Sequence, residues 1–291
     1  MLTLKEVSLR KGKRTYLDEV SFTAEAGRIT AIVGTRSAGR TELVRIIMGL
    51  IAADEGTIEL EDFELDFGDR QNFGYLPAER GGYPNMRVLD QIVYLARLHG
   101  ITLGAAERNA LTLLGHLELA DRGYAPLKNL SGAEIARVDI AATLAADPDV
   151  VVIDDAFAGL DAASLRLVTS LLRAHASSGV PVILGTDDWE AAQTFADDVV
   201  ILGQGKVTAK GSVEKLLGDP HYRVETTDTE AAASALKSRT GISDVKTAGR
   251  ERVSFRANDA RSAAAAVAEL KNVKNFESVR PTLAEQYKEA L

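Results

Sequence analysis

Short apolar runs alternate along the chain with longer stretches in which apolar residues recur at helical spacing. Residues 150–153 are an uninterrupted apolar run, and residues 29–33 are apolar except for Thr30. Such runs are typical of strands covered on both faces of a parallel sheet. Shorter or less regular apolar stretches predict further strands at residues 55–60, 72–76, 180–184, 199–202 and 206–209. Helices are predicted at residues 42–50, 88–98, 106–119, 135–145 and 163–174. This alternation predicts an α/β protein.

The two ends of the chain have different patterns. Residues 2–9 and 17–24 alternate between apolar and polar positions, which predicts an antiparallel strand pair at the edge of the core. Beyond about residue 220, short strand runs alternate with Ala-rich helical stretches. We therefore expect two domains, residues 1–220 and a small α+β domain of residues 221–291.

A glycine-rich turn follows the run at residues 29–33 and precedes a helix. It reads Gly34-Thr35-Arg36-Ser37-Ala38-Gly39-Arg40-Thr41, with Glu42 next. This setting predicts a phosphate-binding loop, because backbone N–H groups of such a turn point inward around an anion. The pattern GxxxxGK[ST] is met except at Arg40, which replaces the lysine. Arginine keeps the charge, but its planar fork differs from a compact ammonium, so we expect binding to persist and γ-phosphate geometry to suffer.

A second group of motifs occupies residues 130–161. It begins with a turn of small and polar residues, Leu130-Ser131-Gly132-Ala133-Glu134. A predicted helix and the buried strand 150–153 follow, and the strand ends in two acids, Asp154 and Asp155. The segment Gly159-Leu160-Asp161 then turns into the next helix.

The order of these motifs resembles that of the ATP-binding-cassette (ABC) transporter ATPases. The segment Gly74–Pro84 resembles the glutamine loop of this family, and most closely that of the subfamily that pairs with ABC-2-type exporter permeases. The resemblance implies a P-loop NTPase core, with a mixed sheet flanked by helices, an antiparallel β edge and a helical insert at about residues 84–147. It implies ATP and Mg²⁺ as cofactors, with the metal held by Thr41 and, through water, by Asp154. It also makes residues 130–134 the signature, which contacts the nucleotide of a second cassette, and residues 159–161 the D-loop.

Four positions depart from the family's catalytic pattern. The first is Arg40, which replaces a lysine. The second is Ala78, which replaces the Gln or Glu that the family has shortly after the strand at residues 72–76. Asp155 replaces the usual Glu and is one methylene shorter, which withdraws a general base from its water. Asp187 replaces a histidine that contacts the γ-phosphate, and a carboxylate there faces like charge. With Asp155 and Asp187 in the catalytic positions, we expect slow or absent hydrolysis in this chain's own site.

A fifth departure from the family's pattern concerns the binding of the adenine ring. Lys11 holds the position of the family's adenine-stacking aromatic, and we interpret the nearby Tyr16 as a packing residue. Loss of a stacking platform weakens adenine binding by about 1–3 kcal/mol.

A further helix is predicted directly after the strand at residues 180–184, and Thr186 is a candidate for its N-cap.

Composition narrows the function classes. The 291 residues carry a net charge of −8, which argues against a nucleic-acid-binding surface. The absence of cysteine removes disulfide and thiolate chemistry and fits the reducing cytoplasm. The charged N-terminus does not resemble a signal peptide. No apolar run approaches the roughly 18 residues of a membrane span, so a membrane role requires another chain.

These features predict a cytoplasmic subunit that lies peripherally on the membrane through a permease, of ABC-2 type, and drives export. The intact signature beside an altered site favours a heterodimer with a second cassette over a homodimer. Two alternatives remain open, namely a cytosolic ATP-binding regulator or scaffold without a transport role, and an active homodimeric ABC ATPase. The transported substrate is chosen by the membrane subunit in this family, so the sequence does not predict it.

Overall fold

The computed structural model describes residues 1–35, 37–66, 68–79, 81–218, 221–249, 251–280 and 282–287. The chain divides into two units between Val213 and Glu214, a little before the boundary expected near residue 220. Each unit has its own sheet and its own core.

A six-stranded sheet forms the centre of the first unit, in the order β10-β9-β3-β8-β7-β6. Its strands are β3 (Ile29–Val33), β6 (Phe73–Leu76), β7 (Val150–Ile153), β8 (Val182–Thr186), β9 (Asp198–Gly203) and β10 (Lys206–Ser212). All neighbouring strands are parallel except β9 and β10. The carboxyl ends of parallel strands meet at one edge, so the segments after β3, β6, β7 and β8 come together there.

The strand β7 shows why its apolar run is uninterrupted. Val151 and Ile153 pack into a core on one face of the sheet, whereas Val150 and Val152 pack into a second core on the other. Successive side chains of a strand point to opposite faces, so a strand covered on both sides needs apolar residues throughout. The sheet and its two covered faces confirm the predicted α/β fold class.

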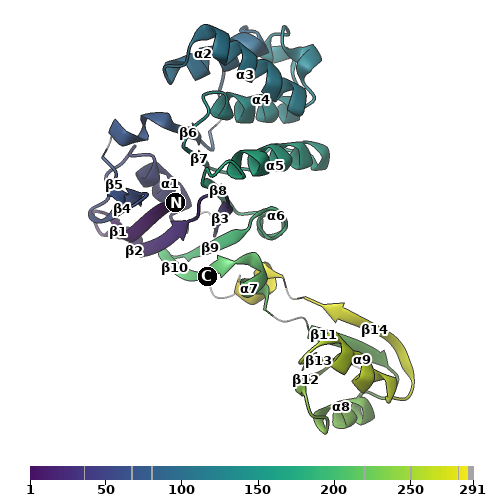
Figure 1. Ribbon diagram of the computed structural model, residues 1–291. Coiled ribbons are helices and arrows are strands. Elements are labelled where there is room, and N and C mark those ends of the chain that lie inside the picture. Colours follow the sequence, from purple (N-terminus) through teal and green to yellow (C-terminus); the bar gives the residue numbers. More distant parts are fainter. Residues whose placement is uncertain are drawn as a thin grey trace. The chain divides into compact units, whose positions relative to one another are not determined.

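Helices flank the central sheet and extend beyond its end. They are α1 (Arg40–Ile47), α2 (Val88–Leu98), α3 (Leu103–His116), α4 (Gly132–Leu144), α5 (Ala162–Ala176) and α6 (Trp189–Phe195), with 3-10 turns at Gly68–Asn72, Ala120–Arg122 and Leu127–Asn129. Three of them, α2, α3 and α4, pack on one another beyond the end of the sheet at β6 and β7 (Figure 1). They occupy the stretch expected to form the helical insert. The helix α3 begins earlier than predicted because the Thr102 side chain caps it.

An antiparallel sheet, in the order β2-β1-β4-β5, flanks the second core. Its strands are β1 (Leu2–Lys11), β2 (Arg14–Ala24), β4 (Glu55–Leu60) and β5 (Phe63–Glu64). Leu4 and Phe22 face each other across β1 and β2 and are both buried, as expected from the alternation of apolar and polar residues. The helix α1 packs between this sheet and the central one, with contacts to β2 and β8.

The second unit contains a four-stranded antiparallel sheet in the order β12-β13-β11-β14. Its elements are β11 (His221–Thr226), α8 (Thr229–Lys237), β12 (Ile242–Ala248), β13 (Arg252–Ala257), α9 (Ala260–Ala268) and β14 (Val273–Val279), and α7 (Val213–Leu217) and α10 (Leu283–Tyr287) flank them. The βαββαβ order with this strand arrangement is the ferredoxin-like split βαβ fold. The pattern did not predict β12, because a register shift between Ser243 and Lys246 interrupts its alternation.

Candidate functional site

The predicted phosphate loop follows β3 and is fixed by two close backbone contacts. A Cβ atom on Gly34 would lie 2.9 Å from the Ala38 Cβ, and closer still to the Leu202 carbonyl oxygen. Gly39 has φ +94°, and a Cβ atom on it would lie 2.5 Å from the Tyr16 carbonyl oxygen. Glycine is therefore required at both positions, at Gly39 for its conformation as well as for the space.

The loop leads directly into the N-terminus of α1. Gly39 is the N-cap residue and has no side chain with which to cap the first N–H groups of the helix, so these groups suit an anion. Thr35 and Ser37 are exposed, while Thr41 and Glu42 are half-buried in the first turn of α1. Arg36 lies outside the described residues.

Arg40 is the first residue of α1 and is only 9% exposed. Its Nε and Nη1 atoms are buried and have no hydrogen-bond partner within the described part of the chain. A buried guanidinium without an acceptor is costly, and an anion held in the loop supplies both the missing acceptor and the opposite charge. The residues of the loop therefore fit a phosphate group.

Asp154 follows β7 and lies at the same edge of the sheet. It is 2% exposed, and its backbone N–H donates to the Leu76 carbonyl oxygen at 2.8 Å, which joins the ends of β7 and β6. Its Oδ2 atom is buried without a hydrogen-bond partner among the described residues. A Cβ atom on Gly185 would lie 3.0 Å from Oδ1, so glycine leaves room beside the carboxylate.

A magnesium ion fits this donor set. Within the described ranges, no three His, Asp or Glu side chains gather as a metal cluster. Mg²⁺ commonly uses one or two protein oxygens and takes its other ligands from phosphates and water. The hydroxyl of Thr41 and the buried carboxylate of Asp154 are oxygens of this kind.

Asp155 adopts a left-handed backbone conformation directly after Asp154. Its φ is +53°, and its side chain is half-buried. The next residue, Ala156, donates its N–H to the Gly185 carbonyl oxygen at 3.0 Å. Non-glycine residues are uncommon in this conformation and concentrate at functional sites.

The end of β8 corrects the prediction for the next helix. Asp188 is the N-cap of α6, because its side chain accepts from the Ala191 N–H at 2.9 Å. The Thr186 hydroxyl instead accepts from the Asp188 N–H at 3.0 Å, so Thr186 stabilises the turn and not the helix. Asp187 lies between them and is exposed, at the same edge as the loop.

Tyr75 on β6 is a residue of this edge that the sequence did not indicate. Burial raises the pKa of the Tyr75 hydroxyl, and the Asp154 carboxylate raises this pKa further. Arg45 of α1 lowers it, first through its positive charge and then through a hydrogen bond. Tyr75 pairs with Val152 in the parallel register, two residues before Asp154. Ala78 and Glu79, which follow β6, are exposed.

The predicted signature forms the start of α4. The Ser131 hydroxyl accepts from the Glu134 N–H at 3.3 Å, and the Glu134 carboxylate accepts from the Ser131 N–H at 2.7 Å. This reciprocal capping box lowers the pKa of Glu134, chiefly through the bond from Ser131. Leu130 is buried, Ser131 and Gly132 are exposed, and Ala133 is half-buried. The signature belongs to the group of α2, α3 and α4, whereas α1 packs against β2 and β8.

The predicted D-loop leads into α5. Gly159 has φ +77°, and the Leu160 N–H donates to the Phe157 carbonyl oxygen at 3.3 Å. The Asp161 carboxylate accepts from the Ser164 N–H at 2.7 Å, and this bond lowers the pKa of Asp161. Asp161 is therefore the N-cap of α5.

The turn between β1 and β2 lies beside the phosphate loop. Tyr16 is half-buried and packs against the second core, as its interpretation as a packing residue requires. The Lys11 Nζ atom lies 5.5 Å from the centroid of its ring, and the Arg14 Cζ atom lies 4.5 Å away.

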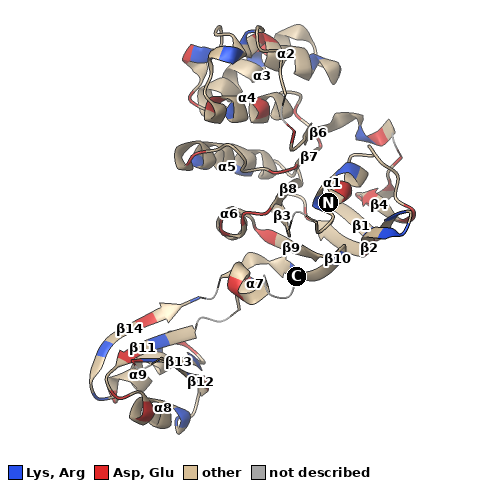
Figure 2. Cartoon of the chain, turned by 180° about the vertical axis from the view of Figure 1, so that it is seen from behind, with Lys and Arg blue, Asp and Glu red and all other residues tan. Residues whose placement is uncertain are grey.

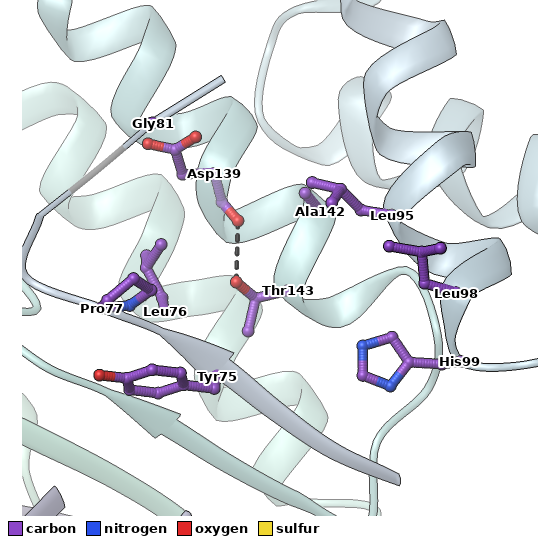
Figure 3. A pocket seen from close by; sticks show the side chains of 10 residues that line it. All are labelled: Tyr75, Leu76, Pro77, Gly81, Leu95, Leu98, His99, Asp139, Ala142 and Thr143. Atoms are coloured by element: carbon purple, nitrogen blue, oxygen red, sulfur yellow. Dashed lines mark hydrogen bonds between the residues drawn. The ribbon is translucent and has the colours of Figure 1, made fainter. Parts of the chain in front are cut away.

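A separate pocket of about 230 Å³ opens between β6 and the helices α2 and α4 (Figure 3). Tyr75, Leu76 and Pro77 line one side, and Leu95, Leu98 and His99 line another. The Thr143 hydroxyl donates to the Asp139 carbonyl oxygen at 2.9 Å along α4. The pocket lies where the chain leaves β6 for the helical group.

No helix in the described part of the chain is long and apolar enough to cross a membrane.

Comparisons with known proteins agree with this architecture. The model of the ABC transporter family matches residues 17–158. An uncharacterized ABC transporter ATP-binding protein of Bacillus subtilis, YhaQ, is 26% identical over 83% of this chain and 81% of its own length. The daunorubicin resistance ATP-binding protein DrrA3 of Streptomyces coeruleorubidus is 29% identical over 83% of this chain and 79% of its length. A solved ATP-binding subunit of an ABC transporter superposes with a TM-score of 0.67 at 25% identity, over 74% of this chain and 91% of its own.

The central sheet, the phosphate loop and the acids at the strand ends define a P-loop nucleotide-binding domain of the ABC ATPase class. Residues 17–158 match the ABC transporter family, and the relatives and the solved structure compared above over most of the chain are ATP-binding subunits of this kind.

Proposed function

We propose that the chain is the ATP-binding subunit of an ABC exporter and that its own site hydrolyses ATP slowly or not at all. One observation carries the proposal. The four altered positions, Arg40, Ala78, Asp155 and Asp187, all follow strands whose carboxyl ends meet at one edge, whereas the signature at Ser131 is a complete capping box. The departures therefore concentrate in this chain's own phosphate site.

The residues of the site have distinct tasks in this proposal. The backbone N–H groups of residues 34–41 bind the phosphates, and Arg40 places its guanidinium against them. Thr41 and Asp154 hold Mg²⁺, which neutralises phosphate charge when bound. Asp155 is too short to bring its carboxylate to the attacking water, and Ala78 has no side-chain group that positions this water. The Asp187 carboxylate faces the like charge of the γ-phosphate.

Export and the permease are supported by different observations. A protein whose name describes daunorubicin resistance is covered over 79% of its length, and removal of a compound from the cell is a direct route to resistance. Exposed apolar side chains surround the exit from β6, among them Tyr83 and Leu98, which are 54% and 66% exposed. We propose that an ABC-2-type permease docks there and keeps the subunit on the cytoplasmic face of the membrane.

The domain assignment completes the proposal. Residues 1–220 form the nucleotide-binding domain, with its helical insert at about residues 84–147. Residues 221–291 form a small α+β domain with a role in dimer contact or regulation. A second, catalytically competent cassette is the partner, because this chain's signature is then used at a working site.

Binding and turnover of the purified chain test the proposal. Calorimetry should detect Mg-ATP binding, because the loop glycines, Thr41 and Asp154 are present, and steady-state hydrolysis should be very slow. The combined variant Arg40→Lys, Ala78→Gln, Asp155→Glu and Asp187→His should raise turnover, whereas each single change should do little, because groups that act as a unit are non-additive. Fast hydrolysis by the unaltered chain would contradict the slow site, and a folded chain that binds no Mg-ATP at millimolar concentration would contradict nucleotide binding.

A further inference from the structure

The phosphate loop and the segment after β8 leave the central sheet side by side. Val33, the last residue of β3, pairs in parallel register with Thr186, the last residue of β8. The residues that follow them, Gly34 and Asp187, therefore leave the sheet at the same level, on strands that lie about 4.8 Å apart. Asp187 is exposed, and its carboxylate places a negative charge beside the start of the loop.

The strand β7 brings two more acids to the same edge. Its last residue, Ile153, pairs with Leu184 of β8, so Asp154 and Asp155 follow up to the level of Thr186. Asp154 is 2% exposed, and Asp155 is half-buried. In Figure 2, red marks such acids between β7 and α5 and between β8 and α6. Three carboxylates therefore gather at the edge of the sheet from which the loop begins.

Arg40 supplies positive charge to the loop from within the fold. Its side chain is 9% exposed, and its Nε and Nη1 atoms are buried without a hydrogen-bond partner in the part of the chain that the structure describes. Such a cation needs an anion close by. A guanidinium is broader than an ammonium, so the Arg40 side chain occupies more of the space beside the loop than a lysine would.

The loop itself has little freedom to widen around this side chain. The Ala38 N–H donates to the Thr35 carbonyl oxygen at 3.0 Å, and the Ala38 carbonyl oxygen accepts from the Gly205 N–H at 3.2 Å. Gly39 packs so closely on the Tyr16 carbonyl oxygen that a Cβ atom would lie 2.5 Å from it. A broad cation beside a loop of fixed width leaves room for fewer phosphate groups.

Charge acts in the same direction as size. The N–H groups at the start of α1 and the Arg40 guanidinium attract the phosphates that lie nearest to them. A third phosphate extends further along the edge, where Asp155 and Asp187 repel its negative charge. A magnesium ion offsets this repulsion when it is bound, so the repulsion should be strongest without the metal.

We propose that this site is selective for a nucleoside diphosphate and that the chain binds ADP more tightly than ATP. The inference rests on the proposed nucleotide binding at the loop. It goes beyond that function because it concerns the number of phosphates that the site accepts. A site that holds a diphosphate has no γ-phosphoryl group to transfer, so the slow turnover has a cause in binding as well as in the groups around the attacking water.

Calorimetry on the full chain tests the proposal with ADP, ATP, pyrophosphate and tripolyphosphate as separate probes, each with and without Mg²⁺. Without Mg²⁺, the dissociation constants of ADP and pyrophosphate should be lower than those of ATP and tripolyphosphate by about tenfold, as expected for like charges a few ångströms apart near a protein surface. Added Mg²⁺ should reduce this ratio. Because pyrophosphate and tripolyphosphate have no base, they isolate the effect of phosphate number.

Three variants assign the selectivity to residues. Asp187→Asn should tighten ATP by about threefold, the order of one exposed charge interaction, and should change ADP much less. Glu190→Gln is the matched control, because it removes an exposed acid from the first turn of α6, and it should leave all four affinities nearly unchanged. Arg40→Lys keeps the charge in a more compact group and should shift the preference toward ATP.

The outcomes separate this inference from the proposed function. ATP that binds as tightly as ADP without Mg²⁺ overturns the inference and leaves nucleotide binding intact. An Asp187→Asn variant that behaves like Glu190→Gln, or a folded Arg40→Lys variant with an unchanged ratio of ADP to ATP affinity, overturns the role given to that residue. If the folded, unaltered chain binds none of the four probes, the proposed nucleotide binding fails and the inference fails with it.

Discussion

Glu134 joins the signature turn to the folding of α4. Its carboxylate accepts from the Ser131 N–H at 2.7 Å and pairs with Arg122 at 3.1 Å. The Ser131 hydroxyl, which we propose contacts the nucleotide of a partner cassette, is thus held in place by a residue whose own charge is partly neutralised by Arg122.

The Glu134→Ala variant should be less stable than the unaltered chain by about 1 kcal/mol at pH 7, because half of the capping box is lost. Folding lowers the pKa of Glu134, so its contribution is fully present above the unfolded pKa of about 4.3 and is lost as pH falls through the lower folded value. Urea unfolding between pH 7 and pH 3 should show the difference shrinking in acid. Glu107→Ala, an exposed position on α3, is the control and should cost little, and an undiminished difference at pH 3 would contradict the assignment.

The position of the helix α1 depends on Gly39. Gly39 has the left-handed conformation required at the start of the helix, and it adjoins the Tyr16 carbonyl oxygen on β2. The helix, the phosphate loop and the antiparallel sheet are therefore packed together through a contact that no other residue permits. Strain at this contact would displace the N–H groups that face the phosphates.

Gly39→Ala should destabilise the chain by more than the roughly 1–3 kcal/mol of a strained backbone position and should abolish nucleotide binding. Gly100→Ala is a matched control, because Gly100 has φ +86° and a Cβ atom on it would meet no other atom within 4 Å. The control carries the conformational cost without the collision, so the difference between the two variants measures the contact with Tyr16. Thermal unfolding and calorimetry check both effects, and equal destabilisation by the two substitutions would show that the contact is unimportant.

At the scale of the whole molecule, the phosphate loop and the signature lie on separate parts of the first unit. The loop packs with α1 against β2 and β8, whereas the signature begins α4 in the helical group. In the proposed arrangement, the signature of one cassette completes the nucleotide site of another. If this chain's own site is slow and its signature acts at the partner's site, substitutions in the signature and in the phosphate site should reduce activity to different extents.

In a complex with the permease and a second cassette, Ser131→Arg should severely reduce ATPase activity and transport. The reason is that the turn's hydroxyl and the N-terminus of α4 stabilise γ-phosphate charge at the partner's working site. Asp155→Ala should cost much less, because its own site contributes little turnover. Activity assays on the reconstituted complex compare the two. Two copies of this chain without another cassette, or a larger loss from Asp155→Ala, would refute the asymmetric arrangement.

The sequence by itself determined the central fold and the order of its motifs. The uninterrupted run of β7 and the glycines of the phosphate loop act through local geometry, because a doubly covered strand needs apolar residues on both faces and a tight loop needs positions without a Cβ atom. These requirements depend only on residues that are close together in the sequence, so the pattern predicted the α/β class. The strand β12 did not, because its register shift disrupts the alternation on which strand prediction depends.

Only the tertiary structure decided which distant residues meet. Parallel pairing of β6 with β7 brings Tyr75 next to Asp154, and the packing of β2 against the loop places Tyr16 beside Gly39. The burial of Arg40, with two nitrogen atoms left without a partner among the described residues, is likewise a feature of the folded chain that its sequence motif did not predict. The structure also decided which of two candidate residues caps α6. The Thr186 hydroxyl accepts from the Asp188 N–H in the turn after β8, and Asp188 caps the helix. Proximity across a sheet depends on strand order and register, which no local pattern of residues specifies.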